Sequence, residues 1–353
     1  MADQAGIQKK PVEPDTLPQG ATNATNSRSR ILSRHRVIEL AEAYALVVLT
    51  IGMAIFFTVY GPTADLFPTS ENLKVLAAQQ GVLAVVALAA LIPLIADEWD
   101  LSVGANAGLA AIFVASAMSK GTSIPVAVAL GIGLGLAVGV FNGLIVTRLR
   151  INAVIPTLGT ATIITGIITA KTGGLSIVSN IPSGVTKFGS GDVLSIPYIV
   201  IAMAVLAGVV YYLLEYTPFG RHIYAIGSNR PAAKLVGINN GRIIFLSFVA
   251  AGFLCGLAGS LQVARSSGVS PEVGEQLTLP ALAAAFLSAA SIRPGRYNVG
   301  GVLVAIFFLA VLNNGLNLAG APNYINDLVN GLALIIGVGF GAVLGRRRMT
   351  SGA

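Results

Sequence analysis

The sequence is poor in the residues that build redox, metal and acid–base sites. It contains one cysteine, Cys255, and two histidines, His35 and His222, among 353 residues. A single cysteine excludes an intramolecular disulfide and a cysteine-rich metal site, and two histidines argue against a histidine-built one. Charge is also scarce, because Asp, Glu, Lys and Arg make up 10% of the chain, against about a quarter in soluble domains.

Motifs of nucleotide binding and covalent catalysis are missing as well. There is no G-x-x-x-x-G-K-[ST] sequence, and no G-x-G-x-x-G opens a helix after a strand. H-E-x-x-H, G-x-S-x-G and S-x-x-K do not occur with supporting context. GLGLAVGVFNG, residues 133–143, is rich in glycine but lies in an apolar run, which favours close helix packing. We therefore expect no covalent chemistry, no metal and no cofactor bound by this chain.

What the sequence has in excess is apolar residues and glycine. Hydrophobic residues make up 54% of the chain, and there are 41 glycines, which suit tight helix packing in lipid. We expect an all-α polytopic membrane protein. Residues 1–36 are polar and end in the basic cluster RSRILSRHR, and no apolar core follows an early charge as in a signal peptide. We interpret them as a disordered basic cytoplasmic tail.

Apolar runs of about 20 residues, the length that crosses a bilayer, occur ten times. The third and eighth are short and rich in small residues, so they could be broken or re-entrant helices. The expected spans are 41–60, 75–96, 102–118, 124–147, 153–171, 196–215, 243–264, 277–291, 299–318 and 324–344.

The distribution of basic residues supports ten spans with both termini in the cytoplasm. With that topology, 17 of the 22 Lys and Arg residues fall on the inner side, as the positive-inside rule requires. FNGLIV (141–146) resembles NNGLNL (313–318), and the third span resembles the eighth at a similar offset. Spans two to five and seven to ten are therefore interpreted as related halves, a common transporter build.

Polar residues inside the apolar chain are candidates for a translocation path or gate. Asp97, Glu98 and Asp100 form the densest acidic cluster, which either shapes the path or caps the third span, since negative charge suits a helix N-terminus. Amides such as Asn142, Asn313 and Asn314 either line the path or join helices by hydrogen bonds. A path lined by neutral amides fits a polyhydroxylated solute better than an ion.

GSNRPAAKLVGI, residues 227–238, is a polar interruption between two apolar runs. Asn229 or a neighbour can cap a helix, Pro231 fits its first turn, and Gly237 can end it, which leaves six or seven helical residues. A helix that short is not stable alone in water. It is therefore either a surface helix held by the protein's own loops or a plug presented to a cytoplasmic partner.

Several motifs resemble one transporter family in the same order. TPFGRHIYAIGSNRPAAKLVGINNGRI, DLSVG, FNGLIVTRLRINAVIPTLGT and VLNNGLNLAGAPNYINDLVNGLALIIGV are similar to segments of permease subunits of ATP-binding-cassette importers of the ribose, xylose and galactose type. The resemblance covers about residues 40–345. It implies a permease homodimer or heterodimer, two ATPase subunits that hydrolyse ATP, and an extracytoplasmic sugar-binding protein.

The resemblance also implies domain bounds and coupling residues. It gives a transmembrane domain at 37–345 with a cytoplasmic coupling loop at 216–242, and a short cytoplasmic tail at 346–353. The residues expected to couple to the ATPase are Asn229, Arg230, Ala232, Ala233, Lys234 and Gly237.

Departures from the family pattern leave the solute open. Gly-Gly pairs expected before DLSVG and after the eighth span are replaced, as in ADEWDLSVG and LSAASIRPGR, so the solute could be a pentose, a hexose, a polyol or another small polar molecule. The alternative is a self-contained secondary carrier, which would require intramembrane carboxylates or cation-binding helix breaks.

Overall fold

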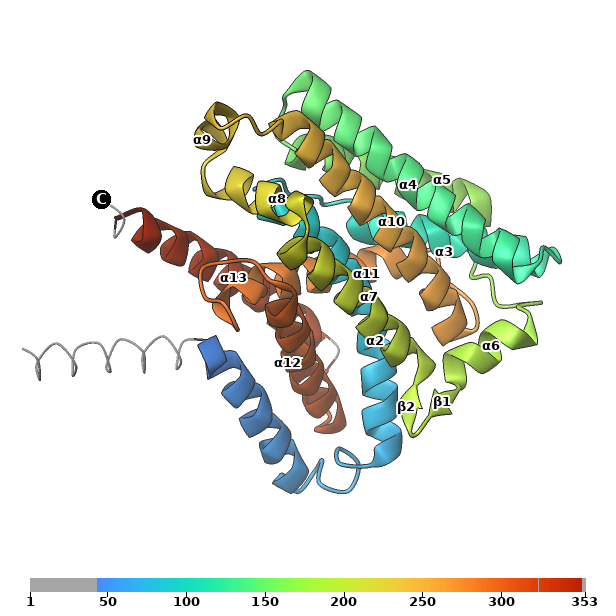
Figure 1. Cartoon of the computed structure of the whole chain (residues 1–353). Helices are drawn as coiled ribbons and strands as arrows, with labels where there is room; N and C mark the ends of the chain where they lie inside the picture. Colours follow the sequence, from blue (N-terminus) through green and yellow to red (C-terminus); the bar gives the residue numbers. More distant parts are fainter. Residues whose placement is uncertain (1–42, 323, 351–353) are drawn as a thin grey trace, which may run out of the picture. The chain divides into compact units, whose positions relative to one another are not determined.

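The computed structural model describes residues 43–322 and 324–350, with side chains as far as residue 339. The expected N-terminal tail, residues 1–36, lies outside the described residues, as do the side chains of the expected tail at 346–353. The described chain is a bundle of helices with one small antiparallel hairpin (Figure 1). The expectation of an all-α polytopic membrane protein is confirmed.

Each of the ten expected spans coincides with a helix in the described part of the chain. Seven of these helices are long and apolar enough to cross a membrane. The ten helices are Ala43–Val59, α2 (Ser70–Ile95), α3 (Val103–Ser119), α4 (Ile124–Leu149), α5 (Val154–Thr172), α7 (Tyr198–Tyr216), α10 (Asn240–Ser266), α11 (Val273–Leu287), α12 (Val299–Leu318) and α13 (Tyr324–Thr350).

The two weak spans differ from each other. The third span, α3, is a continuous helix of 17 residues. The eighth is α11, which contains Pro280 and continues into a 3-10 turn at Ser288–Ala290 before the chain becomes extended at Ser291. The chain then turns before α12 begins at Val299.

The glycines of the 133–143 run serve helix packing. A Cβ atom placed on Gly135 would collide with the backbone of Gly252 and Gly256, and one placed on Gly139 would collide with Phe248. These contacts join α4 to α10 at backbone distance, which only residues without a side chain allow. The glycine-rich segment is therefore a packing surface.

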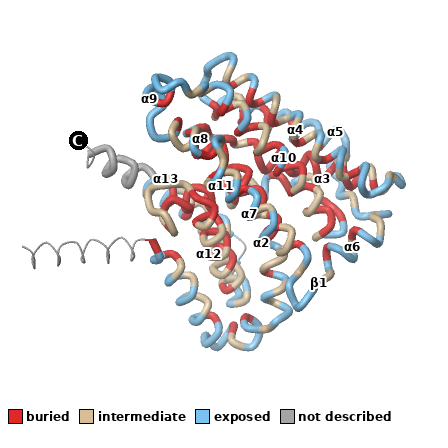
Figure 2. Tube along the Cα trace, in the orientation of Figure 1, coloured by how far each residue is buried: buried red, intermediate tan, exposed pale blue. Residues whose placement is uncertain are grey.

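In the core, the first helix of each half packs against helices of the other half. α10, the first helix of the second half, packs against α3 and α4, and α2, the first helix of the first half, packs against α11 and α12. α2 and α10 also pack against each other. Buried residues concentrate along α2, α3, α10 and α11, whereas α4 and α5 expose much of their surface (Figure 2). The reciprocal packing agrees with two related halves.

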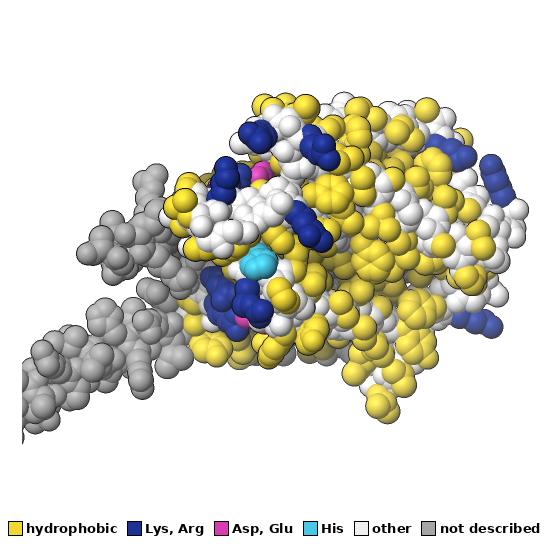
Figure 3. Space-filling model, turned by 45° about the horizontal axis from the view of Figure 1, so that its top comes forward, with side chains coloured by type: hydrophobic (Ala, Val, Ile, Leu, Met, Phe, Trp, Pro, Cys, Tyr) yellow, Lys and Arg dark blue, Asp and Glu magenta, His cyan; other side chains and the backbone are white. Residues whose placement is uncertain are grey.

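Short elements occupy the two ends of the long helices. α6 (Ser183–Ser190), β1 (Asp192–Val193) and β2 (Ile196–Pro197) connect α5 to α7, and α8 (Pro218–Ser228) and α9 (Arg230–Leu235) connect α7 to α10. Because α7 runs from β2 to α8, these two groups lie at opposite ends (Figure 1). Figure 3 shows Lys and Arg side chains gathered toward the ends of the visible face, with a hydrophobic surface between them.

Candidate functional site

The short helix α9 forms by the local signals expected from the sequence. Asn229 is its N-cap, and the side-chain oxygen of Asn229 accepts a hydrogen bond from the N–H of Ala232 at 3.0 Å. Proline occupies the first turn, and Gly237 has a φ of +86°, a left-handed conformation that favours glycine. The helix is 6 residues long, so contacts with the rest of the protein must hold it in place.

Arg230 and Ala233 provide those contacts. The Arg230 guanidinium donates to the carbonyl oxygen of Ala96 at 2.9 Å and to the Glu98 carboxylate at 2.8 Å. The Asn240 amide donates to the Arg230 carbonyl at 2.9 Å. The Ala233 side chain is buried within the chain itself. Arg230 and Ala233 therefore anchor α9 on the protein, whereas Ala232 and Lys234 are exposed.

Two apolar residues at the end of α9 have strongly exposed side chains. Leu235 is 89% exposed and Val236 is 78% exposed, next to exposed Lys234. Neighbouring exposed aliphatic side chains on a loop outside the bundle suit contact with another protein. An apolar pair between Lys234 and Gly237 in a polar loop is the sequence signal that marks this contact surface.

The acidic cluster lies beside α9, in the turn between α2 and α3. Asp97 is exposed with a positive φ, whereas Glu98 and Asp100 are buried. The N-cap of α3 is Ser102, and the Asp100 carboxylate accepts hydrogen bonds from the Ser102 N–H at 2.9 Å and from its hydroxyl at 2.6 Å. Asp100, two residues before the cap, thus stabilises the start of α3. Glu98 instead pairs with Arg230 of α9.

Burial controls the chemistry of Glu98. It raises the pKa of the Glu98 carboxyl above its ordinary value, and the positive charge of Arg230 opposes that shift. The next residue, Trp99, packs edge-on against Phe286 of α11, with ring centroids 4.7 Å apart.

Among the described residues, no group of three His, Cys, Asp or Glu side chains could hold a metal ion.

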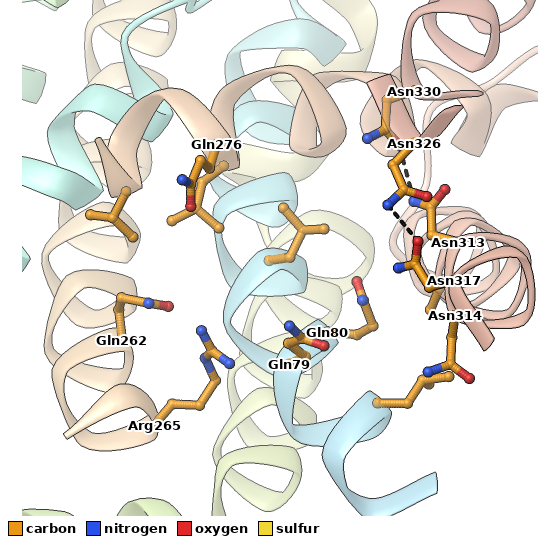
Figure 4. A pocket seen from close by; sticks show the side chains of 15 residues that line it. Gln79, Gln80, Gln262, Arg265, Gln276, Asn313, Asn314, Asn317, Asn326 and Asn330 are labelled. Atoms are coloured by element: carbon orange, nitrogen blue, oxygen red, sulfur yellow. Dashed lines mark hydrogen bonds between the residues drawn. The ribbon is translucent and has the colours of Figure 1, made fainter. Parts of the chain in front are cut away.

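A cavity of about 310 Å³ lies toward the other end of the bundle, between five helices. Its wall includes residues near the end of α10 and the beginning of α13, whereas α9 lies just before the start of α10. Most of its polar side chains are amides (Figure 4). The wall comprises Leu76, Gln79, Gln80, Leu83, Gln262, Arg265, Val273, Gln276, Leu277, Ala310, Asn313, Asn314, Asn317, Asn326 and Asn330.

The amides form a partly paired network. Asn326 donates to Asn317 at 2.9 Å and Asn313 donates to Asn330 at 3.4 Å. Side-chain oxygens of Gln80, Asn313 and Asn326 have no hydrogen-bond partner among the described residues. The wall therefore keeps unused hydrogen-bonding capacity.

Arg265 is the one charged side chain in the described wall. It extends from α10 toward Gln79 of α2 (Figure 4). Within the described residues it forms no ion pair, and its Nε atom is buried without a hydrogen-bond partner. A guanidinium offers up to five N–H donors, so Arg265 adds donors to a wall of amides that both donate and accept.

The structure separates the residues expected along the path. Asn313 and Asn314 lie in the cavity wall, and Asn314 also exchanges two hydrogen bonds of 3.0 Å with Asn72 of α2. Asn142 lies elsewhere: it is fully buried, donates to the Ser102 hydroxyl at 2.8 Å and accepts from the Thr160 hydroxyl at 2.7 Å. Its position matches the alternative role of joining helices.

Asp97, Glu98 and Asp100 are also outside the cavity wall.

A helix bundle of membrane-spanning length, with an amide-lined cavity toward one end and a short exposed helix at the other, has the build of a membrane transport subunit. Comparison with known proteins gives the same class.

Residues 72–338 match the family described as branched-chain amino acid transport system / permease component. The chain belongs to this family. It is 33% identical over 324 residues to the ribose import permease protein RbsC of Escherichia coli K12, an alignment that covers 90% of this chain and 98% of that protein. No solved structure matches the chain.

Two further relatives carry two different substrate names. The ribose import permease protein RbsC of Bacillus subtilis strain 168 is 36% identical over 240 residues, covering 68% of this chain and 74% of the relative. The autoinducer 2 import system permease protein LsrC of Enterobacter sp. strain 638 is 31% identical over 265 residues, covering 75% and 77%. The family is therefore shared by permeases named for different small solutes.

Proposed function

We propose that this chain is the transmembrane permease subunit of an ATP-binding-cassette importer for a monosaccharide or a related polyhydroxylated solute. The observation that carries the substrate class is the amide-rich wall of the 310 Å³ cavity. Two of the relatives are named as ribose import permeases, which agrees with this class. A pentose, a hexose and a polyol are all within it.

The cavity wall has the chemistry that hydroxyl groups require. A hydroxyl donates one hydrogen bond and accepts others, and each Asn or Gln amide does both. The volume of 310 Å³ lies at the lower end of the range for ligand pockets, about 300–1,000 Å³, as suits a small solute. The wall contains no carboxylate among its described residues, so it offers no acidic side chain for the proton binding that a proton-driven carrier uses.

In this proposal, α9 is the helix that couples transport to ATP hydrolysis by the partner subunits. The residues proposed to couple transport to ATP hydrolysis are Asn229, Arg230, Ala232, Ala233, Lys234 and Gly237, to which we add Leu235 and Val236. Ala232, Lys234, Leu235 and Val236 have exposed side chains and contact the partner. Asn229, Arg230, Ala233 and Gly237 shape and hold the helix.

The partners follow from this assignment. Two ATPase subunits hydrolyse ATP on the α9 side, so this chain binds no cofactor and is not itself an enzyme. A soluble binding protein delivers the solute on the cavity side, and a second permease copy completes the transporter. The localisation is the bacterial plasma membrane with both termini cytoplasmic. Lys and Arg residues of the α8–α9 connection and of the turn before α12 support this orientation by the positive-inside rule.

The two buried acids of the cluster stabilise local structure rather than line the path. We assign Glu98 to the ion pair with Arg230, and Asp100 to the start of α3. Asn142 fixes α4 against α3 and α5. Asn313 and Asn314 remain our candidates for the translocation path.

Uptake by the reconstituted complex tests the proposal. Proteoliposomes with this chain, its ATPase subunits and its binding protein are loaded with ATP and given labelled pentoses, hexoses, polyols, autoinducer 2 and branched-chain amino acids. We expect saturable uptake of at least one polyhydroxylated solute and none of the branched-chain amino acids. Uptake restricted to amino acids would refute the substrate class.

A further inference from the structure

A second cluster of polar contacts lies close to α9, between α7, α8 and the turn that precedes α12. The Tyr224 hydroxyl of α8 donates to the carbonyl oxygen of Tyr297 at 2.8 Å. The Arg296 guanidinium lies over the Tyr224 ring, 3.7 Å from its centroid. Glu215, near the end of α7, pairs with Arg293 at 2.6 Å and with Arg296 at 3.6 Å. One carboxylate thus pairs with two cations, and one of these, Arg296, lies over the aromatic ring.

Partial burial strengthens these contacts. Burial raises the pKa of the Tyr224 hydroxyl and raises that of Tyr297 to about 12, so both phenols are protonated at physiological pH. Contact with Glu215 raises the pKa of the Arg293 guanidinium. A cation held over a partly desolvated ring interacts with it more strongly than one in open water. The cluster is therefore a firm joint between α8 and the turn.

The turn itself is stiffened by a single buried side chain. The Asn298 amide donates to the carbonyl oxygens of Ser288 and Ser291 at 3.0 Å and to that of Arg296 at 2.9 Å. Its oxygen accepts from the N–H of Gly301 at 2.7 Å, which caps α12. Every polar atom of this amide side chain is thus used. The turn and the beginning of α12 form one rigid corner.

Helix α12 connects that corner to the cavity wall. Asn313 and Asn314 are in α12, which begins at Val299. The rise of an α-helix places Asn313 about 21 Å from Val299. A tilt of about 5° applied at the corner of a stiff helix of that length moves the amides by about 2 Å, which is enough to break or form hydrogen bonds.

The contact between α9 and the acidic cluster reaches the same cavity by another helix. Arg230 binds Ala96 and Glu98, directly after α2 ends at Ile95. α2 carries Gln79 and Gln80 of the wall. The connection between α7 and α10 is thus joined to two cavity helices, to α2 through α9 and to α12 through α8.

We propose that Tyr224, Arg296 and Glu215 are positioning residues that transmit movement of the α8–α9 connection to α12, and so change the cavity wall in step with the ATPase. This inference rests on the proposed function. It assigns α8 a role distinct from that of α9: α9 receives the force, and α8 delivers part of it to Asn313 and Asn314. Without that joint, ATP is hydrolysed with less solute moved.

The test measures the ratio of ATP hydrolysed to solute imported in proteoliposomes containing the whole complex. Tyr224→Phe removes one hydroxyl and keeps the ring under Arg296. We expect the ratio to rise by about fivefold, the change that corresponds to one neutral hydrogen bond. Glu215→Gln, which releases both arginines, is expected to raise it at least as much. Tyr212→Phe is the matched control, because Tyr212 is an exposed tyrosine of α7, and its ratio stays at the wild-type value.

The outcomes separate this inference from the proposed function. A wild-type complex that imports solute without hydrolysing ATP refutes the proposed function itself. If the wild type couples the two reactions, a raised ratio in either assembled variant supports the joint. Ratios at the wild-type value in both Tyr224→Phe and Glu215→Gln overturn it, and so does an equal rise in Tyr212→Phe.

Discussion

Arg230 and Glu98 form an ion pair with an N–O distance of 2.8 Å although 132 residues separate them in the chain. The glutamate side chain is 9% exposed and the arginine side chain 45% exposed. The pair joins the exposed helix α9 to the end of α2. Two features that the sequence presents separately, a polar loop and an acidic cluster, are therefore one structural unit.

Reversing one charge of this pair is expected to uncouple transport. Arg230→Glu places a second carboxylate beside the buried Glu98, and breaking a partly buried pair in this way is costly. We expect at least a tenfold loss of ATP-dependent uptake, about 1.4 kcal/mol or more in coupling, with normal insertion into the membrane. The double variant Arg230→Glu with Glu98→Arg is expected to recover part of the loss, and a double variant no better than Arg230→Glu alone would argue against the pair.

The raised pKa of Glu98 predicts a specific dependence on pH. Because the folded protein binds this proton more tightly than the unfolded chain, the free energy of unfolding falls as the pH rises from the ordinary glutamate value through the raised one. Acidification through that window protonates Glu98 and weakens its hold on Arg230. As the pH is lowered, uptake should therefore begin to decline while the pH is still above the usual glutamate pKa. The fold itself is not destabilised by this protonation.

Glu98→Gln isolates that effect. We expect it to remove this part of the pH dependence from both the melting temperature and the uptake, with uptake lowered at neutral pH. Glu272→Gln is the control, because Glu272 is an exposed acid next to the start of α11. Glu98→Gln and wild-type profiles that coincide from pH 4.5 to 8 would exclude Glu98 as the titrating group.

Leu235 and Val236 are expected to contribute to binding of the ATPase subunit. Changing both to Asp adds charge where apolar side chains are 89% and 78% exposed, so the fold of this chain loses no buried contact. We expect co-purification of the ATPase to fall by about tenfold or more, as for loss of an interface hot spot. Leu194→Asp changes a leucine that is 91% exposed on the hairpin at the other end and should leave ATPase binding unchanged. Equal binding by all variants would remove this pair from the interface.

The cavity wall should control the apparent affinity for the solute. Asn313→Ala deletes one amide and is expected to raise the KM for uptake by about fivefold, and Arg265→Gln by about tenfold because hydrogen bonds to charged groups are stronger. Kinetics of uptake at saturating binding protein measure both. An unchanged KM in both variants would place the solute elsewhere.

Asn142→Ala provides the contrast within the same residue type. It leaves the buried hydroxyls of Ser102 and Thr160 without their amide partner, which costs about 1–3 kcal/mol. We expect a lower melting temperature in detergent and an unchanged KM for the protein that folds. A raised KM with normal stability would return Asn142 to the path.

Hydrophobic run length was enough to predict the spans, because a helix that crosses lipid must satisfy all its backbone groups internally. The caps of α9 followed from Asn229 and Gly237 for similarly local reasons. Which way an amide faces was not predictable: lipid-facing and protein-facing sides of a membrane helix are both apolar, so Asn142 and Asn313 look alike in sequence. The pairing of Glu98 with Arg230 depends on how α2, α3 and α9 pack.

The most direct test of the account compares two energy sources in one preparation. Uptake of the transported solute is measured in proteoliposomes that contain either this chain alone or the chain with its ATPase subunits and binding protein. We predict uptake only with the full complex and internal ATP, and its loss with Arg230→Glu. Uptake by the chain alone, driven by a proton or sodium gradient and insensitive to Arg230→Glu, would contradict the account.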